Sequence, residues 1–281
     1  MFRRRSKSND TVSSLISQEE KINNDEERLE HQFPASTLME RKRFLNLRAL
    51  KSAETKMESY MNWRQLYQLD STSFTKNDKL SDKEAWNFAV AHAAKYFEGK
   101  GQMPSTLPRI VRFGEKKDLR ALDGRRIAQV LPGLIDKKLA TLDFYALCVG
   151  VFLDVKLDRD SDETIHVLVD VRAGLNWPNP APTVLIPFVI RLTKLLADTA
   201  PERMHKTIVY PIPSAAKPIW AIFKGLIEPK TVSKISILWG PAAANAAIPK
   251  GMTNATFSAK NIESLEDSRY SEFRYNDMSA I

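Results

Sequence analysis

Cysteine is almost absent from the chain, since Cys148 is the only one among 281 residues. A single thiol cannot form a disulfide within the chain, so nothing in the sequence points to an oxidising compartment. Apolar neighbours surround Cys148 between Tyr145 and Val149. Such surroundings are typical of a small buried side chain and not of a reactive nucleophile.

Long apolar runs are also missing. No run approaches the roughly 20 residues that a membrane-spanning helix needs, and Arg191 interrupts the longest candidate, residues 184–190. The basic residues 1–7 are not followed by an apolar stretch, which argues against a secretory signal. We therefore expect a soluble, cytoplasmic protein whose contact with membranes is peripheral and transient.

Recognisable catalytic motifs are absent as well. The chain has neither a glycine-x-serine-x-glycine elbow nor a glycine-rich phosphate loop. Residues 158–162 begin like a calcium loop, but Glu163 and Val169 stand where glycine and glutamate would be needed. No metal-ligand spacing connects the four histidines, which are His31, His92, His166 and His205. We expect no catalytic residue, no metal and no cofactor, and an α/β hydrolase is a poor alternative.

The composition is that of a folded, basic protein. Hydrophobic residues make up 43% of the chain, enough for a core, and the net charge is +8. That charge attracts acidic surfaces, which include both nucleic acid and anionic membrane. The basic residues are scattered and lack interleaved exposed aromatics, so we expect no nucleic-acid partner.

Composition and periodicity divide the chain into four parts. Residues 1–35 are polar and charged, and we expect a disordered basic tail there. Apolar side chains at three- and four-residue spacing predict a small helical module over 36–80. Residues 81–255 should form an α/β domain, and 256–281 a C-terminal tail, either loose or a helix that docks back.

Alternating helix and strand patterns predict the α/β domain. The spacing of Ser81 and Glu84 is a capping box that begins a helix. We expect strands at the following segments: 109–113, 127–131, 165–171, 207–210 and 235–238. Apolar helices are expected at 139–155 and 184–196. Residues 165–171 are almost wholly apolar, which is typical of a parallel strand buried on both faces.

Charged segments bracket an apolar region in the second half of the chain. Pro201-Glu202-Arg203-Met204 precedes an expected strand, and residues 228–235, which include Thr231 and Lys234, follow a very apolar stretch. From spacing alone, Glu202 and Lys234 could form an ordinary surface ion pair worth about 0.5 kcal/mol.

The apolar stretch covers more than one face of a helix. Its large side chains are Ile219, Trp220, Ile222, Phe223, Leu226 and Ile227. A helix that is apolar all round is usually buried in a core. The alternative is a lid that covers an apolar ligand on one side and meets a bilayer on the other.

These segments resemble the second half of a CRAL-TRIO lipid-binding domain. In that family a proline-glutamate-arginine segment precedes a strand, a gate helix and a threonine-x-serine-lysine segment. Residues 43–48 and 62–67 are similar to the family's N-terminal helical module. The resemblance, over about residues 40–250, implies a mainly parallel sheet that floors a lipid pocket under the gate helix.

The resemblance also implies a ligand and its binding residues. The lipid headgroup of phosphatidylinositol-binding members would meet Arg48, Glu202, Arg203, Thr231 and Lys234. Where such members carry two more cations, this chain has Asn46 and Ala49. Where members that also exchange phosphatidylcholine carry hydroxyl groups, it has Ile165 and Val167.

The function that follows is non-enzymatic binding and transfer of a phospholipid between membranes, by a monomer whose partners are the lipid and the membrane surface. Phosphatidylinositol is the ligand that the motifs imply most directly. A lipid-sensing signalling adaptor, or a carrier of a sterol or tocopherol-like ligand, remains the alternative.

Overall fold

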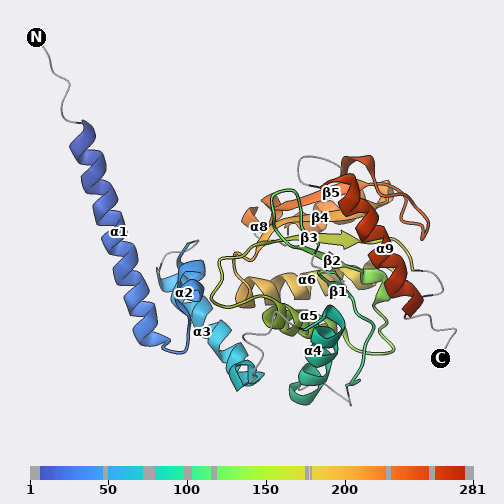
Figure 1. Ribbon diagram of the computed structural model, residues 1–281, viewed down its shortest axis with the longest axis horizontal. Helices are drawn as coiled ribbons and strands as arrows, with labels where there is room; N and C mark the ends of the chain where they lie inside the picture. The colour runs from blue at the N-terminus through green and yellow to red at the C-terminus, as the bar shows by residue number, and fades with distance from the viewer. Residues whose placement is uncertain are drawn as a thin grey trace, which may run out of the picture.

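The computed structural model in Figure 1 places an α/β body beside a set of N-terminal helices. It describes residues 7–46, 50–71, 80–97, 103–114, 119–174, 177, 179–225, 229–252 and 257–275.

The body is built around one sheet. Among the described residues, five strands lie in the order of the chain: β1 (Val111–Arg112), β2 (Ile127–Val130), β3 (Ile165–Asp170), β4 (Met204–Ile212) and β5 (Ile235–Trp239). β1 pairs antiparallel with β2, and the pairs β2–β3, β3–β4 and β4–β5 are parallel. The five expected strands and the mainly parallel sheet are confirmed.

Three helices cover one face of the sheet: α4 (Asp82–Tyr96), α5 (Leu142–Lys156) and α6 (Pro182–Thr199). The expected capping box starts α4, where the Ser81 hydroxyl accepts from the Glu84 N–H at 3.2 Å. α5 is buried on all sides, because α4, α6 and the sheet surround it. Cys148 in α5 is fully buried, as expected, and burial raises the pKa of its thiol.

The opposite face of the sheet is covered by the C-terminal helix α9 (Ala259–Tyr275) (Figure 1). Leu265 of α9 is fully buried against Leu168 and Ile208 of the sheet. Arg269 is also buried and lies 3.4 Å from Asp170 at the end of β3. Over its described part, the segment expected as a tail is therefore a helix that docks back.

Replacing Leu265 with alanine is expected to destabilise the fold by about 2–4 kcal/mol, because a fully buried leucine leaves a cavity when it is truncated. Urea denaturation followed by circular dichroism measures the change. The control is Glu263→Ala on the exposed side of the same helix, which should change stability by less than about 0.5 kcal/mol. Equal effects of the two substitutions would mean that α9 is not docked.

The N-terminal helices are α1 (Lys7–Gln32), α2 (Leu38–Leu45) and α3 (Leu50–Leu66). The expectation of a disordered tail over residues 1–35 is wrong for residues 7–32, which form α1. No glycine or proline interrupts this stretch, and its end is anchored because Leu29 is fully buried with Phe44 and Met57. The start of α1 projects away from the body (Figure 1).

The remaining elements are short. They are the 3-10 helices η1 (Leu69–Ser71), η2 (Pro132–Leu134), η3 (Ser214–Ala216) and η4 (Lys250–Met252), and the helices α7 (Lys217–Gly225) and α8 (Pro229–Ser233). α7 and α8 both lie between β4 and β5 in the chain, in the region where the sequence predicts a gate.

Candidate functional site

Glu202 and Lys234 meet in space, although 32 residues separate them. The Lys234 Nζ atom lies 3.3 Å from both carboxylate oxygens of Glu202. The two side chains are 27% and 23% exposed, so the pair lies at the surface of the body and can be reached by a ligand. Glu202 has a φ of 57°, a left-handed conformation that is unfavourable for residues other than glycine.

The other predicted headgroup residues are only partly described. Thr231 lies in α8, the short helix that ends immediately before Lys234, and its side chain is outside the described part. Arg48 lies outside the described residues, as do Leu226 and Ile227 of the predicted gate. The side chain of Phe223 is outside them too. The roles of these residues stay predictions.

Arg203 has a structural environment that the sequence did not predict. The residue is only 6% exposed. Its guanidinium donates hydrogen bonds to the carbonyl oxygens of Ser161 at 2.9 Å, of Glu163 at 3.0 Å, and of Asp158. Burial, and then the nearby Arg43, lower its pKa to about 10. Arg203 therefore braces the loop before β3, and this contact competes with any role as a headgroup ligand.

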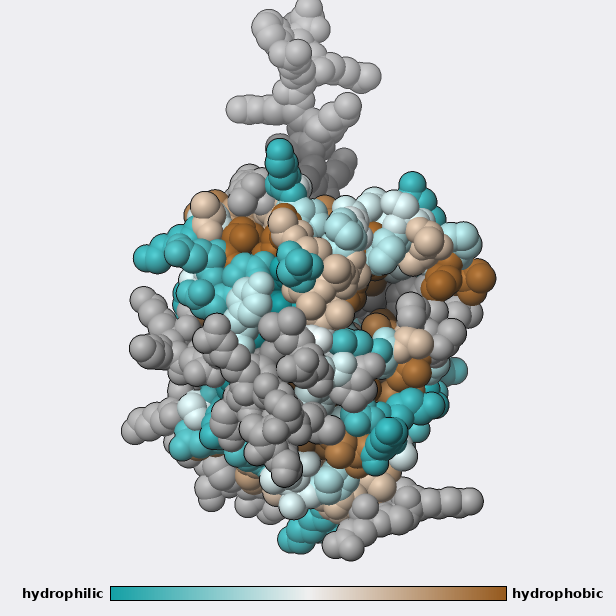
Figure 2. All heavy atoms as spheres, turned by 90° about the vertical axis from the view of Figure 1, so that its right-hand side faces the viewer, coloured by the Kyte–Doolittle hydropathy of each residue, from teal (hydrophilic) through white to brown (hydrophobic). Residues whose placement is uncertain are grey.

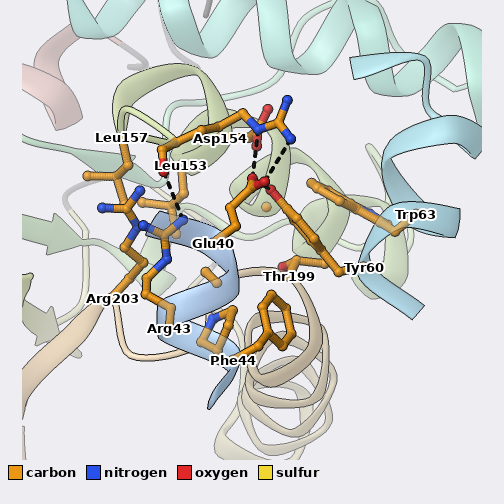
Figure 3. A pocket seen from close by; sticks show the side chains of 14 residues that line it. Glu40, Arg43, Phe44, Tyr60, Trp63, Leu153, Asp154, Leu157, Thr199 and Arg203 are labelled. Atoms are coloured by element: carbon orange, nitrogen blue, oxygen red, sulfur yellow. Dashed lines mark hydrogen bonds and ion pairs between the residues drawn. The ribbon is translucent and has the colours of Figure 1, made fainter. Parts of the chain in front are cut away.

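A buried polar cluster next to Arg203 joins the N-terminal helices to the body. It surrounds a cavity of about 30 Å³, which is about a tenth of the smallest typical ligand pocket. Figure 3 shows the guanidinium groups of Arg43 and Arg203 side by side at this cavity. Arg43 donates to the Ser161 carbonyl oxygen at 2.6 Å, so the two arginines hold the same loop.

Glu40 is the acidic centre of this cluster. Its two carboxylate oxygens accept hydrogen bonds from Arg159 at 2.6 and 2.8 Å. Burial acts to raise the pKa of Glu40, but the contact with Arg159 outweighs burial and lowers it. Arg159 therefore pins the loop before β3 to α2. The spacing of Thr37 and Glu40, a capping box, is the sequence signal that could have located this corner.

An apolar surface lies on the face of the sheet that α5 and α6 only partly cover. The pairing register aligns two rows across three strands, Val169–Val209–Ile237 and Val167–Thr207–Ile235. All of them except the buried Thr207 are half-buried. By contrast, Leu168, Ile208 and Tyr210 on the α9 face are at most 2% exposed. Along β3 and β4 the two faces are therefore unequally covered, whereas both faces of β5 are half-buried.

α7 is an exposed helix in spite of its apolar side chains. Ile219 is 36% exposed and Ile222 is 70% exposed, while Trp220 is half-buried. The alternative that this segment is a buried core helix is therefore wrong for its described residues.

On the face shown in Figure 2, apolar residues reach the surface in several brown patches, and the surface is hollowed between patches on the right.

The described helices do not include a membrane span. None of them is both long enough and apolar enough to cross a bilayer. Contact with a membrane through an exposed helix such as α7 is compatible with this finding.

A mostly parallel sheet with a half-exposed apolar face, together with an exposed apolar helix, is the architecture expected of an α/β lipid-binding domain. Residues 120–243 match the family model described as the CRAL/TRIO domain.

Two individual proteins are similar to this chain. The phosphatidylinositol/phosphatidylcholine transfer protein SFH4 of Arabidopsis thaliana is 29% identical over 157 residues, which are 56% of this chain and 21% of SFH4. The chain thus spans about a fifth of that relative. The crystal structure of Sfh5 aligns with a TM-score of 0.49 at 12% identity, over 72% of this chain and 64% of Sfh5.

Proposed function

We propose that this protein binds one phospholipid molecule at a time and transfers it between membranes. The observation that carries the proposal is the unequal cover of the sheet. Along β3 and β4 one face is buried beneath α9, whereas valine and isoleucine side chains on the other face remain half-buried. A soluble domain rarely leaves a contiguous apolar face uncovered unless a ligand or a partner covers it.

The acyl chains would lie on this half-buried face. Partly buried side chains of α6, including Leu185, Val189 and Leu192, border the same apolar cluster as Val167 and Val169. Each methylene removed from water there contributes about 0.8 kcal/mol. Two acyl chains therefore supply far more free energy than the headgroup contacts, and the headgroup contacts decide which lipid is selected.

The headgroup would bind at Glu202 and Lys234. A carboxylate accepts hydrogen bonds from ring hydroxyl groups, and an ammonium group is a compact partner for phosphate. Phosphatidylinositol offers both groups and fits the pair best. Thr231 and Arg48, which the resemblance assigns to the same site, would add a hydroxyl group and a cation.

The half-buried apolar face of the sheet also indicates which second ligand could bind. Val167 and Ile165 carry no hydroxyl group, and Val167 is half-buried on the floor face. This surface favours a ligand without a polar choline group, such as a sterol, over phosphatidylcholine.

α7 would act as the gate. Its exposed isoleucines gain contacts with a bilayer when the pocket is open and with the bound lipid when it is closed. Opening is then a population shift that the membrane drives through these differential contacts.

Mass spectrometry of lipids that co-purify with the full chain, together with transfer between vesicles, tests the proposal. The wild-type chain should carry phosphatidylinositol and move it to acceptor vesicles. Lys234→Ala should lower phosphatidylinositol transfer by roughly 10- to 100-fold, because a charge-assisted hydrogen bond contributes about 1.5–3 kcal/mol.

The matched control is Lys194→Ala, which removes an exposed lysine of α6 away from the charged pair. Transfer should be unchanged in this variant. If neither Lys234→Ala nor Lys194→Ala loses transfer, the headgroup assignment is wrong. Failure of the wild-type chain to carry or move any lipid would contradict the proposed function itself.

A further inference from the structure

Asp123, His166 and His205 come together at the edge of the sheet where β3 and β4 begin. Asp123 lies in the turn before β2, which Gly124 allows with its φ of 82°. His166 is the second residue of β3, and His205 is the second residue of β4. Asp123 and His166 are 43 positions apart in the chain, which explains why no ligand spacing is visible in the sequence.

A β-bulge aims His205 at the other two residues. Ile165 pairs with Met204, but the next residue, His166, pairs with Lys206. His205 is therefore the extra residue of β4, and bulges commonly redirect a side chain at functional sites. Its ring stands edge-on to that of His166, at a centroid distance of 5.1 Å and an angle of 88°.

The potential ligand atoms are close enough for one ion. The Nε2 atom of His166 lies 2.9 Å from an Asp123 carboxylate oxygen, and one ligand atom from each of the three residues lies within 4.8 Å of the others. Ligand atoms of a tetrahedral zinc site, with bonds of about 2.0–2.1 Å, are about 3.4 Å apart. Asp123 and His205 are exposed, so their side chains have room to rotate toward this geometry.

The buried member of the group has one unsatisfied nitrogen. His166 is 1% exposed, and its Nδ1 atom has no hydrogen-bond partner among the described residues, whereas Nε2 faces Asp123. One imidazole binds an ion through one nitrogen only, so Nε2 is the ligand atom of the proposed site. The edge of the Phe257 ring packs at 5.4 Å and limits the movement of the imidazole.

We propose that Asp123, His166 and His205 form a binding site for a divalent transition-metal ion of the zinc type. Two imidazoles and one carboxylate suit Zn²⁺ or Co²⁺, whereas Ca²⁺ and Mg²⁺ prefer six or more oxygen ligands. Because Asp123 and His205 are exposed, water completes the coordination. The bound ion ties the turn before β2 to the bulge of β4, three residues after Glu202.

Two cations lie close to the site. Arg125 pairs with the Asp123 carboxylate, with Nη1 at 2.9 Å from Oδ2, and Lys234 is near enough to act on His205. A bound ion therefore takes the place of Arg125 as the partner of Asp123.

Titration of the untagged, chelator-stripped full chain with ZnCl₂, followed by calorimetry, tests the site. One Zn²⁺ ion should bind per chain, and CoCl₂ should give visible absorption bands of a low-coordinate Co²⁺ complex. His205→Ala and Asp123→Asn change exposed side chains and should each weaken binding at least about tenfold. Both variants should keep the wild-type circular dichroism spectrum.

The matched control is His31→Ala, which removes an exposed histidine at the end of α1 and should leave Zn²⁺ affinity and stoichiometry unchanged. The proposal is overturned if the wild-type chain binds Zn²⁺ more weakly than about 100 µM. It is equally overturned if neither His205→Ala nor Asp123→Asn reduces the affinity. Lipid transfer is measured separately, so the two proposals fail independently.

Discussion

Replacing Arg64 with alanine is expected to lower the free energy of unfolding by about 3–5 kcal/mol, because it leaves a mostly buried carboxylate without its partner. The Arg64 side chain is fully buried in α3. Its guanidinium contacts Asp154 of α5, lies 2.8 Å from Asp70, and donates to the Tyr60 hydroxyl at 3.1 Å. Burial raises the pKa of Asp154, so this carboxylate depends on the arginine to stay charged.

Urea denaturation of the full chain, monitored by circular dichroism and by tryptophan fluorescence, measures this loss. The matched control is Arg191→Ala, which breaks an arginine–aspartate pair whose side chains are 42% and 60% exposed. An exposed pair contributes at most about 1 kcal/mol. If Arg64→Ala and Arg191→Ala lower the free energy of unfolding equally, the buried contacts of Arg64 do not hold the N-terminal helices on the body.

Replacing Ile222 with glutamate is expected to abolish most membrane-dependent transfer while leaving the fold intact. The side chain is 70% exposed, so the folded protein loses little. Removing an isoleucine that would be buried in the bilayer costs about 1.5–3 kcal/mol, which is roughly a 10- to 100-fold loss of vesicle affinity. Vesicle co-sedimentation and lipid transfer measure the effect.

Ala221→Glu is the control, since it adds the same charge to an exposed position of α7 without removing a large apolar group. It should reduce vesicle binding much less than Ile222→Glu. Unchanged binding and transfer in Ile222→Glu would show that α7 does not meet the membrane. The gate assignment would then have to move to another element.

The helices and strands of the body could be predicted because local patterns agree with their final environments. The apolar, β-branched segment around Val167 is a central parallel strand, and the Ser81–Glu84 capping box starts α4. The tail expectation failed at α1, because polar composition alone does not show that Leu29 has a buried partner. For the same reason, the sequence did not decide whether α9 is a loose tail or a helix that docks back.

The candidate site could be predicted only where a motif names its members. Glu202 and Lys234 were paired through resemblance to a family, and the structure brings them to 3.3 Å. The same motif includes Arg203. No sequence pattern shows that its guanidinium already donates hydrogen bonds to backbone carbonyl groups. Glu40 and Arg159 carry no motif that links them, because they are 119 positions apart in the chain.

The sequence by itself determined the class of the fold, the order of its elements and the two charged segments, since these depend on short-range periodicity and on residue type. Only the tertiary structure decided which groups are buried, which charges are paired and which apolar face stays uncovered. It also brought His205 to His166, through a β-bulge that no local pattern specifies. The physical reason is that burial and pairing depend on contacts between residues far apart in the chain.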